Sequence, residues 1–359
     1  MKKVTVRDTI ALLDRLIATP SHSREEAATA DILEAFLREH GADVQRIHNN
    51  VWAKCAGYDA SKPTLLLNSH HDTVKPSSAY TVDPYCPLHD NGRIYGLGSN
   101  DAGASLVALA TVFCNNNHSE LSYNIVLALT AEEEVMGDRG MRAMLPEFER
   151  QGIKIDMALV GEPTGMHAAV GERGLLVFDA TVQGVRGHAA RNEGVNALYK
   201  AIADIERLRN YRFERRSELL GDISVAVTMI SAGTQHNVVP DECRFVVDVR
   251  TTDAYTNEQT VELLQSVVEC ELKPRSTRVR ASALGEEHPL VKAAEAVGRE
   301  RFVSPTTSDM ALMPFPSLKM GVGDSARSHS ADEFVLESEI VEGVLLYERM
   351  LNELKKLIG

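Results

Sequence analysis

The chain has 359 residues, enough for two domains at roughly 150 residues each, so a small disulfide-stapled scaffold is excluded. Hydrophobic residues make up 44% of the chain and the formal net charge is −13, which is typical of a globular protein that repels nucleic acid and anionic lipid. No apolar run approaches the roughly 20 residues that cross a bilayer, and we find no secretory signal. We therefore expect a cytoplasmic protein with no membrane and no nucleic-acid partner.

The first half of the chain predicts alternating helices and strands. Ser23 and Glu26 have the spacing of a capping box, which predicts the start of a helix that ends near Gly41. Short, nearly continuous apolar runs then predict buried strands of an α/β sheet. These runs cover residues 64–68, 124–130 and 157–161. Acidic residues or histidines follow each run, at the edge where open α/β sheets place their ligand sites.

From about residue 175 the pattern changes to a βαββαβ order. The predicted elements are a strand at 175–184, a helix at 194–209, strands at 222–232 and 242–251, a helix at 257–272 and a strand at 276–283. Thr256 and Gln259 form a capping box for the second of these helices. Helix and strand then resume, and a final helix is predicted over 337–357.

This order of elements predicts an α/β fold in which one domain interrupts another. The outer domain, residues 1–173 and 284–359, has a mostly parallel sheet flanked by helices. The inserted domain, residues 174–283, is a ferredoxin-like βαββαβ unit.

The first candidate site residues follow the strand at 64–68. His70 and Asp72 are two residues apart, so they share one face of an extended chain and can hydrogen-bond. A metal-ligating histidine usually donates its second ring N–H to such a carboxylate. Asp101 lies in a glycine-rich segment before a helix, where one carboxylate could bridge two cations. A polar strand end and a helix N-cap are the alternatives for these residues.

Further acids follow the next two strands. Three adjacent glutamates, Glu132 to Glu134, come after the strand at 124–130, and such a cluster is costly unless it is solvated or neutralised by a cation. One could ligate a metal while another accepts a proton from water. Glu162 repeats the pattern, and His329 adds a nitrogen donor later in the chain. Solvated loops are the alternative, but the agreement of all these segments favours a metal site.

Five segments together resemble the motifs of the co-catalytic zinc amidohydrolases, a family that includes acetylornithine deacetylase, succinyl-diaminopimelate desuccinylase, aminoacylase and the glutamate carboxypeptidases. They are residues 67–74, 95–101, 130–134, 161–164 and 329–333. The segments have the order and spacing of the family, and the resemblance covers nearly the whole chain.

The resemblance implies a set of roles for individual residues. The ligands of two Zn²⁺ ions, with Co²⁺ able to substitute, would be His70, Asp101, Glu134, Glu162 and His329. Asp101 would bridge both ions, Asp72 would orient His70, and Glu133 would be the general base.

The same resemblance makes the inserted domain a lid. His188 would donate a hydrogen bond to the oxyanion, and Asn237 and Arg250 would hold the substrate carboxylate. From the residues alone, Asn237 would be a turn residue before proline and Arg250 a solvated strand end. A homodimer through the lid is implied as well, with His188 acting in its own chain or in the partner.

The resemblance implies hydrolysis of the amide bond of a small-molecule N-acyl amino acid. We expect N-acetylornithine in arginine biosynthesis, with succinyl-diaminopimelate desuccinylase or a di-zinc exopeptidase or dipeptidase as the alternative. A non-catalytic binding module is disfavoured because Glu133 and every ligand position are present. The acyl group and the amino acid stay open.

Overall fold

The computed structural model describes residues 3–191 and 193–358. The chain folds into two compact units: unit 1 comprises Met1–Val170, Leu284–Phe302 and Ser308–Gly359, and unit 2 comprises Gly171–Ala283 and Val303–Thr307. The predicted ranges 1–173 and 284–359 include residues 1, 2 and 359, which lie outside the described part of the chain.

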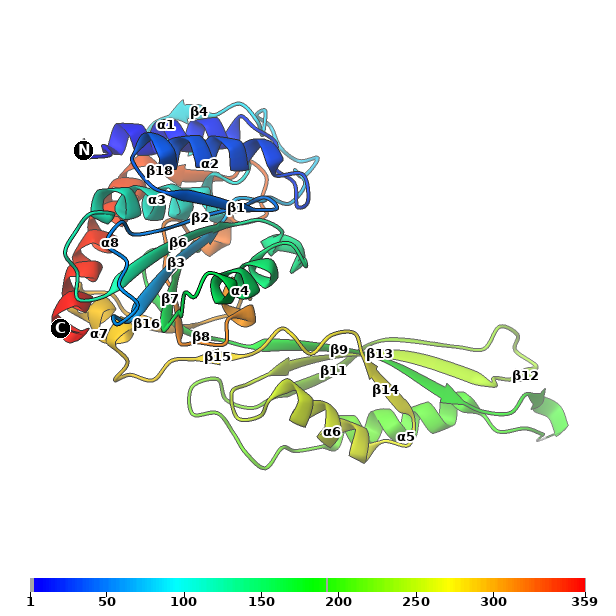
Figure 1. Cartoon of the computed structure of the whole chain (residues 1–359). Helices are drawn as coiled ribbons and strands as arrows, with labels where there is room; N and C mark the ends of the chain where they lie inside the picture. Colours follow the sequence, from blue (N-terminus) through cyan, green and yellow to red (C-terminus); the bar gives the residue numbers. More distant parts are fainter. Residues whose placement is uncertain (1–2, 192, 359) are drawn as a thin grey trace. The chain divides into compact units, whose positions relative to one another are not determined.

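A mixed sheet forms the centre of unit 1 (Figure 1), and its strand order begins β1-β2-β6-β3-β7-β17-β8. The strands are β1 (Val44–Ile47), β2 (Asn50–Lys54), β3 (Thr64–His70), β6 (Asn124–Thr130), β7 (Met157–Val160), β8 (Ala168–Glu172) and β17 (Ser317–Lys319). The pairs β6–β3, β3–β7 and β7–β17 are parallel. The predicted α/β fold with a mostly parallel central sheet is therefore confirmed.

Helices cover both faces of this sheet. They are α1 (Val6–Ile17), α2 (Ala27–Glu39), α3 (Ala104–Asn116), α4 (Met141–Arg150), α7 (Pro289–Ala296) and α8 (Glu337–Ile358). Leu65 and Leu67 belong to the same core as α1, α2, α3 and α8, whereas Leu66 packs in the core that includes α4. Successive strand residues point to opposite faces, so burial on both faces explains the unbroken apolar run of β3.

Smaller elements of unit 1 lead into the site. A three-stranded sheet has the order β18-β5-β4, and four short helical turns lie in the loops. Their bounds are β4 (Leu88–Asp90), β5 (Arg93–Tyr95), β18 (Phe334–Leu336), η1 (Ser99–Gly103), η2 (Glu133–Val135), η4 (Asp309–Leu312) and η5 (Ser325–Arg327). β16 (Arg301–Ser304) follows α7 in the chain.

Unit 2 contains an antiparallel sheet with the order β11-β13-β9-β14. Its elements are β9 (Gly174–Gln183), β10 (Gly187–His188), η3 (Ala189–Arg191), α5 (Ala197–Asn210), β11 (Ser224–Ala232), β12 (Val238–Val239), β13 (Glu242–Thr251), α6 (Asn257–Val267), β14 (Glu271–Pro274) and β15 (Ser282–Ala283). The chain order β9-α5-β11-β13-α6-β14 and this strand order match the predicted ferredoxin-like unit. Residues of β9, β13, α5 and α6 share its core.

The predicted capping box at Ser23 and Glu26 is wrong. α2 begins at Ala27, and Glu26 at its N-cap makes no side-chain cap bond. The Ser23 hydroxyl instead donates to Asp72 Oδ2 at 2.7 Å, and the Glu26 carboxylate accepts from Asn49 Nδ2 at 2.8 Å. Long-range partners have therefore taken both side chains.

The end of the inserted unit also differs from the prediction. The helix predicted over 257–272 ends at Val267. In place of one strand over 276–283, the chain has β14 over Glu271–Pro274 and the short β15 over Ser282–Ala283. Leu272 is buried in the core of unit 2 and pairs with Ala180 of β9. Burial of this side chain favours an extended segment directly after the helix.

Among residues 3–191 and 193–358, no helix has the length and apolar character that a membrane span requires.

Candidate active site

The candidate site lies at one edge of the unit 1 sheet. His70 ends β3, Glu133 and Glu134 follow β6, and Glu162 follows β7. These strands are neighbours in the order β6-β3-β7 and are parallel, so their carboxyl ends meet. Two loop residues, Asp101 and His329, complete the group described below.

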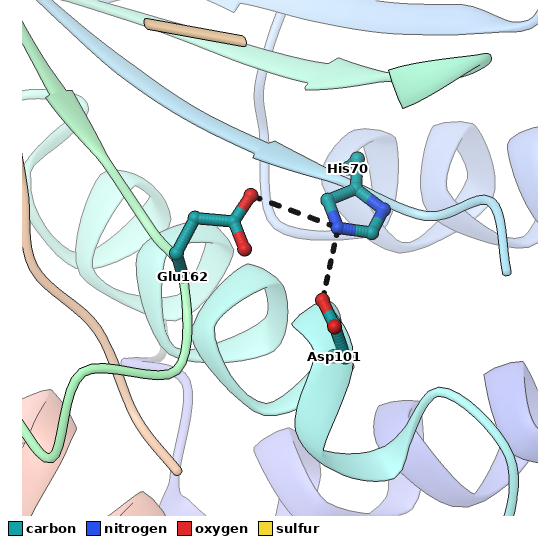
Figure 2. A group of neighbouring side chains, drawn as sticks. All are labelled: His70, Asp101 and Glu162. Carbon is teal, nitrogen blue, oxygen red and sulfur yellow. Dashed lines mark hydrogen bonds and ion pairs between the residues drawn. The ribbon is translucent and has the colours of Figure 1, made fainter. Parts of the chain in front are cut away.

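The first candidate metal-binding triplet combines a buried histidine with two partly buried carboxylates (Figure 2). His70, Asp101 and Glu162 each present one possible ligand atom, and these atoms lie within 4.8 Å of one another. His70 Nε2 is 3.3 Å from Asp101 Oδ1 and 3.7 Å from Glu162 Oε1. A nitrogen and two carboxylates at this spacing form a donor set that suits Zn²⁺ and similar divalent ions.

The second triplet contains Asp101, Glu134 and His329, again with ligand atoms within 4.8 Å of one another. His329 Nε2 is 3.0 Å from Glu134 Oε2 and 3.7 Å from Asp101 Oδ2. The His329 side chain is 54% exposed, whereas that of His70 is 1% exposed. Asp101 belongs to both triplets, with Oδ1 facing His70 and Oδ2 facing His329.

Hydrogen bonds orient the His70 ring. Its Nδ1 is 2.9 Å from the backbone carbonyl oxygen of Asp72, which can only accept, so Nδ1 donates this bond and Nε2 is the nitrogen that faces the candidate cation site. The acceptor of this bond is the backbone of Asp72, and the Asp72 carboxylate also lies close, with its Oδ1 3.5 Å from His70 Nδ1. The Asp72 carboxylate accepts from the backbone N–H groups of Glu133 (3.0 Å) and Glu134 (3.2 Å) and fixes that turn.

The electrostatics of the site call for a cation. Burial raises the pKa of Glu162 to about 8, and burial also raises the pKa values of Glu133 and Glu134. Burial by itself would lower the pKa of His70, but the charges of Glu162 and Glu133 and hydrogen bonds with Asp101 and Asp72 raise it well above its ordinary value. Divalent ions would relieve this concentration of negative charge.

Glu133 faces the first triplet. Its Oε2 is 3.9 Å from His70 Nε2, and the side chain is buried. Glu133 is in neither triplet, so its carboxylate is free of the ligand role that Glu134 can take. A buried carboxylate with a raised pKa beside a metal site suits a general base.

The structure does not bring the candidate residues of unit 2 together as one group. His188 pairs with Val238, next to Asn237, and the side chains of His188 and Asn237 are exposed. Arg250 lies near the C-terminal end of β13. Its Nε donates to Asp248 Oδ1 at 2.8 Å, and a terminal nitrogen donates to Asp248 Oδ2 at 3.1 Å.

Two buried acids near the site were missed in the sequence. Asp309 Oδ2 accepts from Thr130 Oγ1 at 2.7 Å, and burial raises the Asp309 pKa to about 6. Glu333 accepts three backbone N–H bonds from the segment that contains Asp101, and burial raises its pKa to about 7. Glu333 lies in the resembling segment 329–333, but no role was predicted for it, and Asp309 had no sequence signal.

A sheet edge with two ligand triplets that share a carboxylate, beside a separate buried glutamate, defines a metal-dependent hydrolase. The model of the peptidase family M20/M25/M40 matches residues 66–353, so the chain belongs to this family.

Curated relatives and solved structures agree with this assignment. The chain is 27% identical to a succinyl-diaminopimelate desuccinylase of Delftia acidovorans over 97% of this chain and 98% of that protein. It is 28% identical to a protein of the same name from Alkalilimnicola ehrlichii over 94% of this chain and 98% of that protein. Among solved structures, aminopeptidase PepT of Bacillus cereus is 18% identical with a TM-score of 0.78, covering 98% of this chain and 99% of that one. The M20 family metallo-carboxypeptidase Sso-CP2 of Sulfolobus solfataricus is 17% identical with a TM-score of 0.75, covering 97% and 99%. These structures establish the fold.

Proposed function

We propose that the chain hydrolyses the amide bond of an N-acyl amino acid and that two divalent ions occupy the two triplets of unit 1. The observation that carries this proposal is the shared position of Asp101 between His70 and Glu162 on one side and Glu134 and His329 on the other. Nitrogen and carboxylate donors fit Zn²⁺, and Co²⁺ suits the same set. When bound, the ions would supply Lewis-acid polarisation and a lowered pKa for a water molecule between them.

Glu133 carries the proton transfers of this proposal. Its carboxylate accepts the proton of the attacking water and then delivers it to the departing nitrogen, which must leave as an amine because an amide anion is too basic. Asp72 supports this role, because its carboxylate holds the backbone N–H groups of Glu133 and Glu134. The base and its neighbouring ligand are thus fixed by one side chain.

For the substrate we favour an N-succinyl amino acid, with N-succinyl-diaminopimelate first. The names of the curated relatives support this choice, and those relatives match the chain over nearly its whole length. Deacetylation of N-acetylornithine, the expectation from sequence, has less support from these names. The likeness to solved peptidases lies below 25% identity, so it supports the fold but gives no argument for a peptide substrate.

We propose unit 2 as the lid, with His188 as an oxyanion donor and Asn237 and Arg250 as ligands of the substrate carboxylate. Arg250 is eight residues from the start of β13 at Glu242, and eight extended residues span about 26 Å. The His188 strand lies beyond that start, where Gly184 N–H bonds Asp241 O. One substrate therefore cannot contact both His188 and Arg250 of a single unit 2.

This separation supports a homodimer in which His188 reaches the substrate held by the partner. The exposed surface of unit 2 has apolar side chains that a second copy could cover. They are Tyr199 and Ile202 on α5 and Met229 and Ile230 on β11. β11 is also an edge strand of its sheet, and edge strands are open to pairing.

A cytoplasmic location of the protein stays a prediction.

The test is hydrolysis of a substrate panel by metal-stripped protein with and without Zn²⁺ or Co²⁺. The panel contains the N-succinyl and N-acetyl derivatives of diaminopimelate and ornithine, together with dipeptides. We expect metal-dependent release of the amino acid from an N-succinyl compound, and release about 10²- to 10⁴-fold slower by Glu133→Gln. Turnover of dipeptides alone would contradict the deacylase assignment, and turnover of N-acetylornithine alone would contradict the succinyl preference.

A further inference from the structure

Glu333 is a buried carboxylate that the catalytic scheme does not use. Its side chain belongs to unit 1 and is 2% exposed. Glu333 Oε1 accepts the backbone N–H groups of Asn100 at 2.9 Å and Asp101 at 2.8 Å, and Oε2 accepts that of Gly98 at 3.1 Å. Three charge-assisted hydrogen bonds therefore converge on one carboxylate.

The segment that donates these bonds has little regular structure of its own. Gly98 has φ +75°, and a Cβ at this position would lie 2.6 Å from Thr73 Cγ2. Asp101 has φ −114° and ψ 99°, which is not helical, although it lies within the η1 turn. The first N–H groups of a helical segment have no acceptor within the segment, and here a carboxylate from a distant part of the chain accepts them.

The backbone around Glu333 connects this acceptor to the second triplet. Gly96 N–H bonds the Glu333 carbonyl at 3.0 Å, and the pairing continues as Phe334 opposite Tyr95. His329 is four residues before Glu333. The same short segment thus presents one ligand of the second triplet and fixes the backbone of the ligand that both triplets share.

We propose that Glu333 is a positioning residue that sets the Asp101 carboxylate between the two triplets. This inference rests on the proposed dinuclear site. Loss of the three acceptor bonds would let the backbone at Asp101 shift, and both ions would bind more weakly. Groups that orient metal ligands typically change metal affinity or activity by about 10- to 100-fold when they are replaced.

The neighbouring acid offers a matched control. Asp332 accepts from Thr81 N–H at 2.7 Å, from Thr81 Oγ1 at 2.6 Å and from Val82 N–H at 3.2 Å. It therefore anchors a different loop through the same number of bonds from the adjacent position. Asp332→Asn should disturb the 81–82 loop and leave the Asp101 segment in place.

The experiment is a titration of the metal-stripped full-length chain with Co²⁺, followed by calorimetry and by the visible absorption of the bound ion. We compare the wild-type chain with Glu333→Gln, Glu333→Ala and Asp332→Asn. We expect Co²⁺ affinity about 10- to 100-fold lower in the Glu333 variants, with an altered Co²⁺ spectrum, and affinity within about twofold of wild type in Asp332→Asn. Excess Co²⁺ should restore part of the lost activity, which a merely structural defect would not allow.

Three outcomes would overturn the inference. Wild-type affinity and an unchanged spectrum in a folded Glu333→Gln chain would show that the carboxylate does not position the ligand. An equal loss in Asp332→Asn would make the effect a general property of the segment. Failure of the wild-type chain to bind two Co²⁺ ions would overturn the proposed function, and the inference with it. If Glu333→Ala does not fold, the nearly isosteric Glu333→Gln decides.

Discussion

The candidate residues of unit 1 and those of unit 2 differ in how far the fold prepares them. In unit 1, candidate ligands from three strand ends and two loops converge within a few ångströms. The carboxylates of Asp72 and Glu333 hold two of these segments by accepting their backbone N–H groups. In unit 2, His188 and Asn237 are exposed, and Arg250 is paired with Asp248 near the other end of a long strand. One site is assembled within its unit, and the other is a set of separate contacts.

The difference follows from what each set would bind. Divalent ions need several donors at fixed short distances, so the donors must be positioned before the ion arrives. Groups that recognise a flexible substrate can be brought in by closure or by a second chain. Unit 1 should therefore respond to substitutions through metal content and kcat, and unit 2 through KM and assembly.

The largest expected effect is that of Glu133→Gln. The side-chain amide of the introduced glutamine cannot take the proton of the attacking water, so kcat should fall by about 10²- to 10⁴-fold. Metal content should stay at the wild-type level because Glu133 is in neither triplet. Steady-state kinetics and elemental analysis check both statements. Loss of metal together with activity would move Glu133 from the base role to a ligand role.

Substitution of the shared ligand separates the two triplets. Asp101→Asn should weaken both ions by more than about 100-fold, because the replaced oxygens belong to both triplets. His329→Ala should weaken only the exposed triplet and leave one tightly held ion. Metal analysis after dialysis against a weak chelator measures the difference. Equal metal content in the two variants would show that Asp101 does not bridge.

The contrast with unit 2 is sharpest at Arg250. Removal of a charged hydrogen-bond partner of the substrate carboxylate should raise KM about 10- to 100-fold in Arg250→Ala, with unchanged metal content. Arg244→Ala is the matched control, because Arg244 lies on the same strand and pairs with Glu242 two residues before it. If both variants raise KM equally, the effect comes from the charge of the strand and not from a specific contact.

Much of this site could be predicted from the sequence because its signals are local. The apolar runs before His70 and Glu133 predicted strands that the structure contains, and parallel strands must bring their ends together. Thr256 and Gln259 form the predicted capping box because their hydrogen-bond partners lie three residues apart. Patterns of this kind need no knowledge of the rest of the chain.

The errors came from partners that are distant in the sequence. Ser23 has the spacing of a helix cap, but Asp72, 49 residues away, accepts its hydroxyl hydrogen. Glu333 lies 232 residues from Asp101 N–H, so no local pattern could reveal its role. Leu272 fits a helical face as well as a strand, and only the core of unit 2 decided between them.

The pH dependence of Tm in the metal-free chain tests whether burial destabilises the ionised acids of unit 1. The folded pKa values of Glu162 (about 8) and Asp309 (about 6) lie above their ordinary values, so the folded chain holds these protons more tightly than the unfolded chain. The stability they contribute is complete below about pH 4 and is lost as pH rises through 6 and 8. We expect Tm to fall by on the order of 5 °C between pH 5 and 8.

Two controls accompany this measurement. Glu162→Gln removes one titrating carboxyl and should flatten the decline, and Zn²⁺ should reverse it at pH 8 by neutralising the site. A Tm that rises between pH 5 and 8 in the metal-free chain would show that the acids of unit 1 are not destabilised by burial.

The smallest expected effect compares the two units through a matched pair of helix caps. Thr5 caps α1 in unit 1 and Thr256 caps α6 in unit 2, each in a capping box. Thr5→Ala and Thr256→Ala should each lower the free energy of unfolding by about 1 kcal/mol, because one N–H at the helix start loses its acceptor. Hydrogen exchange should report the loss at α1 in the first variant and at α6 in the second, with Co²⁺ affinity unchanged in both. A fall in Co²⁺ affinity in Thr256→Ala would contradict the view that unit 1 assembles the metal site by itself.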